Sequence, residues 1–304
     1  MKVGFCSLYG LANAGKSTIL NAILKTKIEA VSEKPQTTRE NIQGIYNDED
    51  SQIVFVDTPG LHDPHKKLGQ LMLQEAKSAL YDVDAIIYVV DASKRVDKKT
   101  ANRLATLDTP IILAFNKIDL IKFEQGQEKI KEYKEILPNA DVVELSAINK
   151  AGIEQLVSTV KKYLQEGTPY FPQDMISDHP EEFIYSETIR EKCMRLTEDE
   201  VPHACHVEIK HVEEEDNLLI IRADIIVERE SEKAIMIGRQ GKMISKIRRY
   251  SEEALKGFLG RPVSLDLLVK VVPDWRDNPK YLRRYGYMKW EKKFTTLPWW
   301  RALP

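Results

Sequence analysis

The chain has 304 residues, of which 42% are hydrophobic and 30% are charged, as expected for a soluble globular protein of two domains. Its three cysteines, Cys6, Cys193 and Cys205, are too few and too scattered for a disulfide framework or a zinc site, which indicates a reducing compartment. The apolar runs are no longer than strands, and the N-terminus lacks a signal peptide's apolar stretch. The sequence therefore argues against secretion and against a membrane span.

The net charge of −2 is divided unevenly along the chain. Residues 238–304 contain 16 Lys and Arg and 6 Asp and Glu, a net charge of +10, so the remainder carries −12. A basic C-terminal part is the electrostatic footprint of a polyanionic partner. A solvated basic face would give the same contrast, and charge alone does not separate the two interpretations.

The first half of the chain alternates between short apolar strands and helical patterns. The predicted strands are residues 2–9, 41–46, 53–57, 85–91, 111–116 and 141–145. The predicted helices are residues 16–25, 68–81, 98–107, 124–137 and 152–164. Because these strands read as continuous Val, Ile and Leu runs, they are expected to be buried on both faces. We predict a largely parallel, doubly wound α/β domain over residues 1–166.

A phosphate loop is predicted between the first strand and the first helix. Residues 10–17 read GLANAGKS and match the pattern G-x-x-x-x-G-K-[ST]. In such a loop, backbone N–H groups and the N-terminus of the next helix face the phosphates, while Lys16 neutralises their charge. The predicted phosphate-binding residues are Gly10, Asn13, Ala14, Gly15, Lys16, Ser17, Thr18 and Gly60.

Two segments are predicted to sense the γ-phosphate. Switch I comprises Gln36, Thr37, Thr38 and Arg39. Switch II comprises Asp57, Thr58, Pro59, Gly60 and Leu61. Asp57 can hold Mg²⁺ through a water molecule, Ser17 can ligate it directly, and Gly60 can donate its N–H to the γ-phosphate. A switch I threonine is expected to complete the Mg²⁺ shell, and we favour Thr38 over Thr37; an ordinary polar loop is the alternative for switch I.

A guanine site is predicted where two further strands end, because doubly wound sheets bind ligands at that edge. Asn116, Lys117 and Asp119 form an N-K-x-D motif. The Asp119 carboxylate can accept hydrogen bonds from guanine N1–H and N2–H₂, whereas adenine has neither donor and would leave the carboxylate unpaired. The backbone N–H groups of Ser146 and Ala147 can meet guanine O6. The sequence therefore predicts GTP and GDP as ligands.

The alternation ends at residues 167–180, a segment with Pro and Gly that we predict to be a linker. A helix over residues 181–196, strands over 206–212 and 218–227, a short helix, a G-x-x-G turn, a helix to about residue 258 and a strand over 263–272 follow. This order over residues 181–276 resembles an α+β type II KH domain, although a lone G-x-x-G is weak support. The candidate RNA-binding residues are Ile237, Gly238, Arg239, Gln240, Gly241, Lys242, Lys246, Arg248 and Arg249.

Residues 277–304 form a predicted basic and aromatic tail. Its cationic residues are Arg283, Arg284, Lys289, Lys292 and Lys293. Its aromatic residues are Tyr285, Tyr287, Trp290, Phe294, Trp299 and Trp300. Base stacking on RNA, attachment to a membrane surface, and docking on the chain's own surface are all consistent with this composition.

These motifs together resemble the Era family of translation-factor-related GTPases, and the resemblance covers nearly the whole chain. It rests on exposed polar strings, among them Pro35-Gln-Thr-Thr-Arg39, Asp57-Thr-Pro-Gly-Leu-His62, Phe171-Pro-Gln-Asp-Met-Ile176 and Val269-Lys-Val-Val-Pro-Asp-Trp275. The resemblance implies a Mg²⁺-dependent GTPase that binds the 3′ end of 16S ribosomal RNA and assists maturation of the 30S subunit. We expect a cytoplasmic monomer that binds no DNA, with peripheral contact on the inner face of the cell membrane as a further expectation.

The sequence departs from the family pattern or from that of other GTPases at three positions. Ala12 and Ala14 replace the usual Pro and Val, which should leave a less stiffened phosphate loop. Leu61 stands where Ras-like GTPases carry a water-orienting Gln, which implies slow intrinsic turnover and help from elsewhere. A K⁺ ion near Asn13, as in related GTPases, is a candidate for that help.

Three alternatives stay open at this point. An RNA-binding protein with a degenerate, non-switching nucleotide site is the competing function. A P-loop kinase is disfavoured by the guanine-reading motif. His62 and His65 could suggest a metal site or a base, but we favour exposed histidines on a switch loop.

Overall fold

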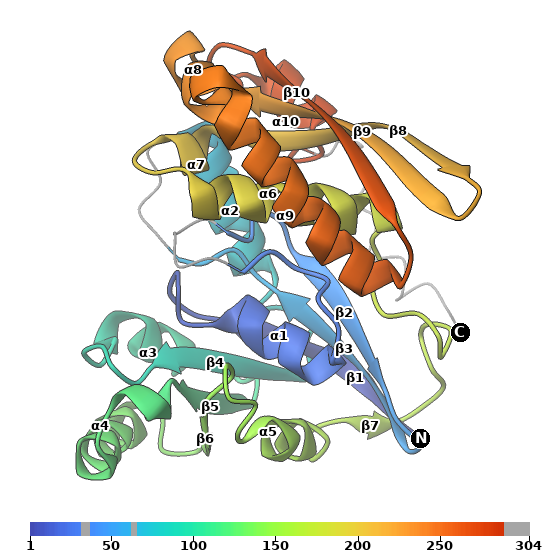
Figure 1. Cartoon of the computed structure of the whole chain (residues 1–304). Coiled ribbons are helices and arrows are strands. Elements are labelled where there is room, and N and C mark those ends of the chain that lie inside the picture. Colours follow the sequence, from blue (N-terminus) through green and yellow to red (C-terminus); the bar gives the residue numbers. More distant parts are fainter. Residues whose placement is uncertain (32–36, 62–65, 289–304) are drawn as a thin grey trace.

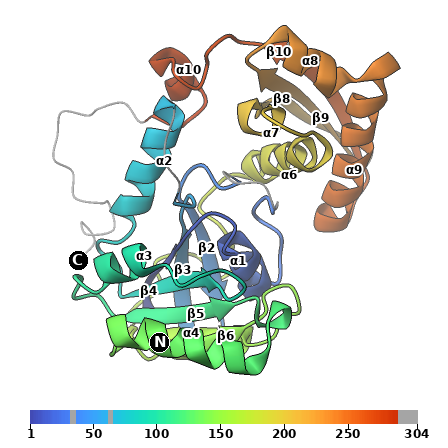
Figure 2. The ribbon, with the colours of Figure 1, turned by 90° about the vertical axis from the view of Figure 1, so that its left-hand side faces the viewer.

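The computed structural model describes residues 1–31, 37–61 and 66–288. An N-terminal domain built on a large sheet lies against a second domain built on a smaller sheet (Figure 1). The helix α2 of the first domain rises beside the second one, as a view from another side shows (Figure 2). The two domains are therefore in direct contact and are not joined by the linker alone.

The first domain is a doubly wound α/β fold. Its strands are β1 (Lys2–Tyr9), β2 (Ile42–Asn47), β3 (Ser51–Asp57), β4 (Ala85–Asp91), β5 (Ile111–Asn116), β6 (Asp141–Leu145) and β7 (Gln165–Glu166). Its helices are α1 (Lys16–Leu24), α2 (Lys67–Ser78), α3 (Lys98–Leu104), η1 (Ile118–Leu120), α4 (Phe123–Ile136) and α5 (Ile153–Val160). The strand order is β2-β3-β1-β4-β5-β6, with β7 paired to β1. The neighbours are parallel except for β2 on β3 and β7 on β1.

Helices cover both faces of this sheet. The apolar cluster on one face contains α1 and α5 side chains such as Ile19 and Leu156, both fully buried. The cluster on the other face contains side chains of α2, α3 and α4, among them Ala76, Leu104 and Tyr133. A parallel sheet covered in this way presents the C-terminal ends of β1, β3, β5 and β6 at one edge, so the predicted motifs meet there.

The linker runs along the exposed edge of β2. Ile45 N–H donates to the Ile176 carbonyl over 3.0 Å, and Gly44 forms a bridge with Ser177. Further along, the Gln52 amide donates to the Phe171 carbonyl over 2.8 Å. These bonds attach the linker to the first domain and cover a strand edge that would otherwise be open to pairing.

The second domain packs helices on one face of a three-stranded sheet. Its elements are α6 (Glu181–Leu196), α7 (Val201–Ala204), β8 (His206–Glu215), β9 (Leu218–Val227), α8 (Glu230–Ile237), η2 (Arg239–Gly241), α9 (Lys242–Leu259), β10 (Val263–Val271) and α10 (Pro279–Arg284). The sheet order is β10-β9-β8, with β10 parallel and β8 antiparallel to β9. Asp216 and Asn217 both have positive φ, the geometry of a two-residue hairpin turn between β8 and β9.

A separate apolar cluster joins the two domains. It contains Leu68 and Met72 of α2, Trp275 after β10, and Leu282 and Tyr285 at α10. Trp275 is fully buried, and its ring N–H donates to the Ala204 carbonyl over 2.9 Å. The segment after β10 is thus part of the domain junction as far as Met288.

The ends of the predicted strands agree with those observed to within three residues, and helix ends differ by up to four. Four short elements, β7, η1, α7 and α10, were not predicted from the sequence. Each is too short for a periodic pattern and depends on packing against distant segments. Among the described residues, no helix is both long enough and apolar enough to cross a bilayer.

Shortening Leu282 should destabilise the junction. Its side chain is fully buried in the joining cluster, so Leu282→Ala is expected to cost about 2–5 kcal/mol of unfolding free energy in chemical denaturation. Leu268→Ala, at a side chain that is 56% exposed, is the control and should cost no more than about 0.5 kcal/mol. Equal effects of the two substitutions would contradict the packing described here.

Candidate functional site

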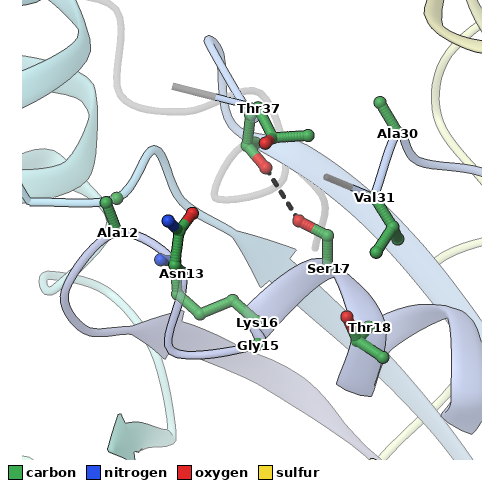
Figure 3. Close-up of a pocket in the computed structure, with 11 residues that line it drawn as sticks. Ala12, Asn13, Gly15, Lys16, Ser17, Thr18, Ala30, Val31 and Thr37 are labelled. Carbon is green, nitrogen blue, oxygen red and sulfur yellow. Dashed lines mark hydrogen bonds between the residues drawn. The ribbon is translucent and has the colours of Figure 1, made fainter. Parts of the chain in front are cut away.

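A pocket opens where β1 turns into α1, at the position of the predicted phosphate loop (Figure 3). The residues that line it are Ala12, Asn13, Gly15, Lys16, Ser17, Thr18, Ala30, Val31, Thr37, Thr38 and Gly60. The predicted loop residues Gly10 and Ala14 are buried behind this surface. The structure therefore brings six of the eight predicted phosphate-binding residues to one pocket, and the other two support it.

The shape of the loop depends on glycine at position 15. Gly15 has φ 103°, and a Cβ atom there would lie only 2.3 Å from Nδ2 of Asn116. Lys16 is 6% exposed, and its Nζ donates to the carbonyls of Gly10 over 3.3 Å and Leu11 over 3.2 Å. Burial lowers the pKa of Lys16, while the carboxylates of Asp57 and Glu29 oppose this shift. The loop thus holds a buried cation at the N-terminus of α1, which suits a phosphate chain.

Three side-chain oxygen atoms, from Ser17, Thr38 and Asp57, lie together beside Lys16. Ser17 Oγ lies 2.8 Å from both Asp57 Oδ2 and Thr38 Oγ1, and Thr38 Oγ1 donates to Asp57 Oδ2 over 3.2 Å. Asp57 is fully buried, and its Oδ1 has no hydrogen-bond partner among the described residues. Hydroxyl and carboxylate oxygens with one unsatisfied buried acceptor fit Mg²⁺ and its water shell. The switch I hydroxyl in this cluster is that of Thr38 and not that of Thr37.

The sequence analysis missed one acidic residue at this cluster. Glu29 is 2% exposed, and its Oε2 accepts a 3.4 Å hydrogen bond from Thr38 Oγ1. Burial, together with the nearby Asp57 carboxylate, raises the pKa of Glu29 well above its usual value. Glu29 lies in a loop after α1 and belongs to no motif, so the sequence carries no signal for it.

Switch II lies directly against the phosphate loop. Thr58 is buried and donates to the Leu8 carbonyl over 2.8 Å. Gly60 faces the pocket, and the Leu61 N–H donates to the Gly10 carbonyl over 3.2 Å. The Leu61 side chain packs on the apolar cluster of α3 and α4 and offers no polar group to a water molecule. Pro59, which lies between Thr58 and Gly60 in the chain, is buried. His62 and His65, like Gln36 of switch I, lie outside the described residues.

The residues predicted to bind guanine lie at the ends of the next strands. Asn116 is 2% exposed; its Nδ2 donates to the Ala14 carbonyl over 2.8 Å, and its Oδ1 accepts from Ala147 N over 3.1 Å. The Lys117 ammonium donates to the Asn13 carbonyl over 2.8 Å and pairs with Asp91 over 2.7 Å. Asn116 and Lys117 thus connect the phosphate loop, the end of β4 and the segment after β6, which together form one rim of the site.

Asp119 and Ser146 complete this rim. Asp119 lies in η1 with an exposed carboxylate, free to meet a ligand from the same edge of the sheet. The Ser146 N–H is bonded to the Ala151 carbonyl over 3.0 Å and the Ala147 N–H to Asn116 Oδ1 over 3.1 Å, so both N–H groups predicted to meet guanine O6 have partners within the chain. Asp91, which positions Lys117, was not identified from the sequence.

Switch I continues from the pocket into the second domain. The Thr37 carbonyl accepts a hydrogen bond from Nη2 of Arg190 in α6. Arg39 is 5% exposed and donates to the carbonyls of Cys205 over 2.8 Å and His203 over 3.1 Å. Its guanidinium also lies 5.7 Å from the centre of the Trp275 ring, as a cation–π contact. The Arg39 side chain is therefore not part of the nucleotide pocket and instead connects the two domains.

The segment after switch II makes a second connection. Lys66 pairs with the buried carboxylate of Glu228 over 3.1 Å and with Asp277 over 3.2 Å. Arg276 binds the same Glu228 over 2.6 Å, and the Leu68 N–H donates to the Arg276 carbonyl over 3.0 Å. These cations lower the pKa of Glu228, although burial acts in the opposite direction. Switch I and the segment that follows switch II are thus both bonded directly to the second domain.

The G-x-x-G turn stands between α8 and α9. Gly238 has φ 71°, and a Cβ atom there would lie 2.6 Å from Cβ of Met243, so no larger residue fits. The predicted cations Arg239, Lys242, Lys246, Arg248 and Arg249 are exposed along this turn and α9, as is Gln240, while Ile237 and Gly241 are partly buried. Within the described residues Arg239, Lys242 and Arg248 form no ion pair. Free cations beside a small-residue turn suit a nucleic-acid backbone.

Comparison with known proteins identifies the family. Residues 5–117 match the family model of 50S ribosome-binding GTPases, and residues 200–276 match that of KH domains. GTPase Era of Caldanaerobacter subterraneus subsp. tengcongensis is 44% identical over 291 residues, which cover 94% of this chain and 98% of that protein. The chain belongs to the Era family of GTPases. Its predicted fold class, a P-loop GTPase domain followed by a KH domain, is confirmed.

Two solved Era structures resemble this chain over 94% of its length. A variant of Era from Aquifex aeolicus bound to GDP·AlF₄⁻ is 40% identical, with a TM-score of 0.90 over 99% of that chain. Era in complex with MgGDPNP and nucleotides 1506–1542 of 16S ribosomal RNA is also 40% identical, with a TM-score of 0.89 over 99% of that chain. As an Era-family member, the chain is a GTPase.

Removing the Asn116 side chain should weaken GTP binding. Asn116→Ala leaves the Ala14 carbonyl and the Ala147 N–H without their buried partner, so Kd for GTP measured by calorimetry is expected to rise about tenfold or more. Asn102→Ala is the matched control, because the exposed Asn102 amide bonds only to a helix carbonyl, that of Lys98. An unchanged Kd for Asn116→Ala would refute the role assigned to this rim.

Proposed function

We propose that this GTPase is a molecular switch that binds the 3′ end of 16S ribosomal RNA through its KH domain and assists maturation of the 30S ribosomal subunit. The observation that carries the proposal is the double attachment of switch I. Thr38 belongs to the oxygen cluster beside Lys16, while the next residue, Arg39, is bonded to the carbonyls of Cys205 and His203. A change at the phosphate end therefore acts directly on the RNA-binding domain.

In this proposal the phosphates and the base of the nucleotide have partners in the chain. The loop N–H groups, Thr18 and Lys16 bind the phosphates, and Asp119 selects guanine over adenine through the donors that guanine offers. Ser17 and Thr38 hydroxyls and the Asp57 carboxylate would hold Mg²⁺, which supplies charge neutralisation on the phosphates.

Hydrolysis would release the contacts that the γ-phosphate maintains. Thr38 and the Gly60 N–H lose their shared partner, so switch I and switch II are free to separate. Since Arg39 and Lys66 connect these segments to the second domain, the KH surface changes its position or its access to RNA. Leu61 cannot orient water, which accords with slow turnover.

The RNA would bind along the turn and the first half of α9. Arg239 and Lys242 are placed for phosphates, and Gly238 allows close approach of the backbone. Lys246 and Arg249 lie against Tyr250, with their charged groups 5.9 Å and 5.0 Å from the ring centre, while Arg248 is exposed beside them. Binding that relies on these cations should weaken as salt rises.

Replacing both turn glycines should abolish RNA binding without affecting GTP binding. Gly238→Asp with Gly241→Asp introduces two negative charges where phosphate would lie, and position 238 has no room for a side chain. Labelled RNA of the 16S 3′ end would be titrated against the chain held with GDP or with a non-hydrolysable GTP analogue. Wild type should show different affinities in the two states, and the double variant should bind in neither.

Gly257→Asp is the control for this experiment, because it places the same charge on α9 at an exposed position with open space around it. Calorimetry with GTP on each variant verifies the nucleotide site. Equal RNA affinity in both nucleotide states would refute the switch, and undiminished binding by the double variant would refute the RNA surface.

We further propose that K⁺ stimulates hydrolysis from a site beside Asn13. Asn13 lines the pocket at the phosphate end with φ 63°, a conformation that asparagine tolerates. GTP hydrolysis is expected to be faster in K⁺ than in Na⁺ at equal ionic strength. Asn13→Gly, which keeps the backbone conformation accessible, should remove the difference between the salts. Identical wild-type rates in K⁺ and Na⁺ would exclude this site.

A further inference from the structure

A second groove lies between the domains, beside α2 and away from the nucleotide pocket. It offers about 550 Å³ to water-sized molecules, within the range of ligand-binding clefts. Its lining includes the apolar side chains of Val56, Leu68, Leu71 and Ala79. The lining also includes Arg39 of switch I, residues that follow it, and the end of the linker. The function proposed above uses Arg39 through its bonds to the second domain but assigns no ligand to the groove itself.

Three buried polar atoms at this groove have no hydrogen-bond partner within the described residues. They are Arg39 Nε, Asn41 Oδ1 and Gln43 Oε1, on residues that all line the groove. Arg39 itself is 5% exposed. Buried polar atoms are rarely left unpaired, because each costs about 1–3 kcal/mol. Their gathering at one groove indicates an occupant that brings hydrogen-bonding groups.

The groove is rich in carboxylates. Glu40, Glu75 and Asp178 line it, and Asp178 is paired with His179. Burial raises the pKa of Glu40 to about 7, although the nearby His179 and Arg190 act in the opposite direction. An occupant with cationic and N–H donor groups for the carboxylates and the two amide oxygens, and with apolar surface for Leu68, Leu71 and Ala79, would match this lining.

The chain carries such a segment at the rim of the groove. Gly286 and Tyr287 line the groove, and the described residues end one position later, at Met288. Residues 289–304 read KWEKKFTTLPWWRALP, with four cationic residues against one Glu, three Trp and one Phe. At about 3.3 Å per extended residue, this length of chain easily spans the groove.

We propose that residues 289–304 dock in this groove, with aromatic side chains against Leu68, Leu71 and Ala79 and cationic groups toward Glu40, Glu75 and Asp178. Because the segment begins at the rim, its local concentration there is high and no separate encounter is needed. An acidic groove would repel RNA and anionic lipid, so this location favours docking on the chain's own surface over the other two interpretations of the tail.

Docking would connect the parts of the molecule that respond to the nucleotide. The groove is lined by the residues after switch I, by the helix after switch II and by the end of the linker. A docked tail would therefore bind both switch-linked segments to the α10 end of the second domain. The proposal does not depend on which RNA the KH domain binds.

Photo-cross-linking in the full-length chain tests the proposal. A benzoyl-phenylalanine placed at position 299 should form adducts with residues 39–43, 68–83 and 178–180, located by mass spectrometry. Lys292→Glu with Lys293→Glu, or Glu75→Lys alone, should lower the adduct yield about fivefold, as expected for lost or reversed ion pairs. Combining Glu75→Lys with the two tail substitutions should restore part of the yield.

Glu124→Lys is the matched control, since it reverses an exposed carboxylate on α4, far from the groove, and should leave the yield unchanged. The tail variant, Lys292→Glu with Lys293→Glu, changes no groove residue. It therefore tests the proposal even if Glu75→Lys prevents the chain from folding. Adducts only with added single-stranded RNA, or only with vesicles of phosphatidylcholine and phosphatidylserine, would overturn the proposal. Adducts that are absent from the groove, or insensitive to the charge reversals, would overturn it as well.

Discussion

Two adjacent residues, Thr38 and Arg39, impose the constraint on which the arrangement of this molecule depends. The Thr38 hydroxyl belongs to the oxygen cluster with Ser17 and Asp57, and the Arg39 guanidinium is buried between the domains. A peptide unit fixes consecutive Cα atoms about 3.8 Å apart, so neither side chain can move far without the other. The nucleotide site and the KH domain consequently share one short piece of backbone. Arg190 also bonds to this piece at Thr37, and Lys66 adds a second connection between the domains at Glu228.

The residues predicted for the nucleotide site lie close together in the structure because each motif is local in the chain. Gly15, Lys16 and Ser17 act through a strand, a tight loop and a helix that are contiguous, and Asn116 and Asp119 follow a single strand. Such motifs keep their geometry wherever the sheet places them. The choice of Thr38 over Thr37 followed from the same reasoning, and the structure has the Thr38 hydroxyl at the cluster.

What the sequence did not predict depends on contacts between distant segments. Glu29 and Arg190 are a single acid in a loop and a basic residue on a helix, and only the folded chain brings them to switch I. Likewise α10 has six residues, too few for a periodic signal, and it is defined by Leu282 packing in the cluster with Trp275 and Met72. Arg39 was assigned to the switch from its position, but its partners, the carbonyls of Cys205 and His203, carry no side-chain signature.

The attachment of the linker to β2 restricts how the two domains can move. Bonds from Gln52 to Phe171, from Ile45 to Ile176 and from Gln43 to Asp178 make the segment before position 179 part of the first domain. Since α6 begins at Glu181, only about two residues are left to act as a hinge. Any rotation of the second domain must pivot at this point. Such a rotation also has to break the hydrogen bonds that Arg39 and Arg190 form between the domains.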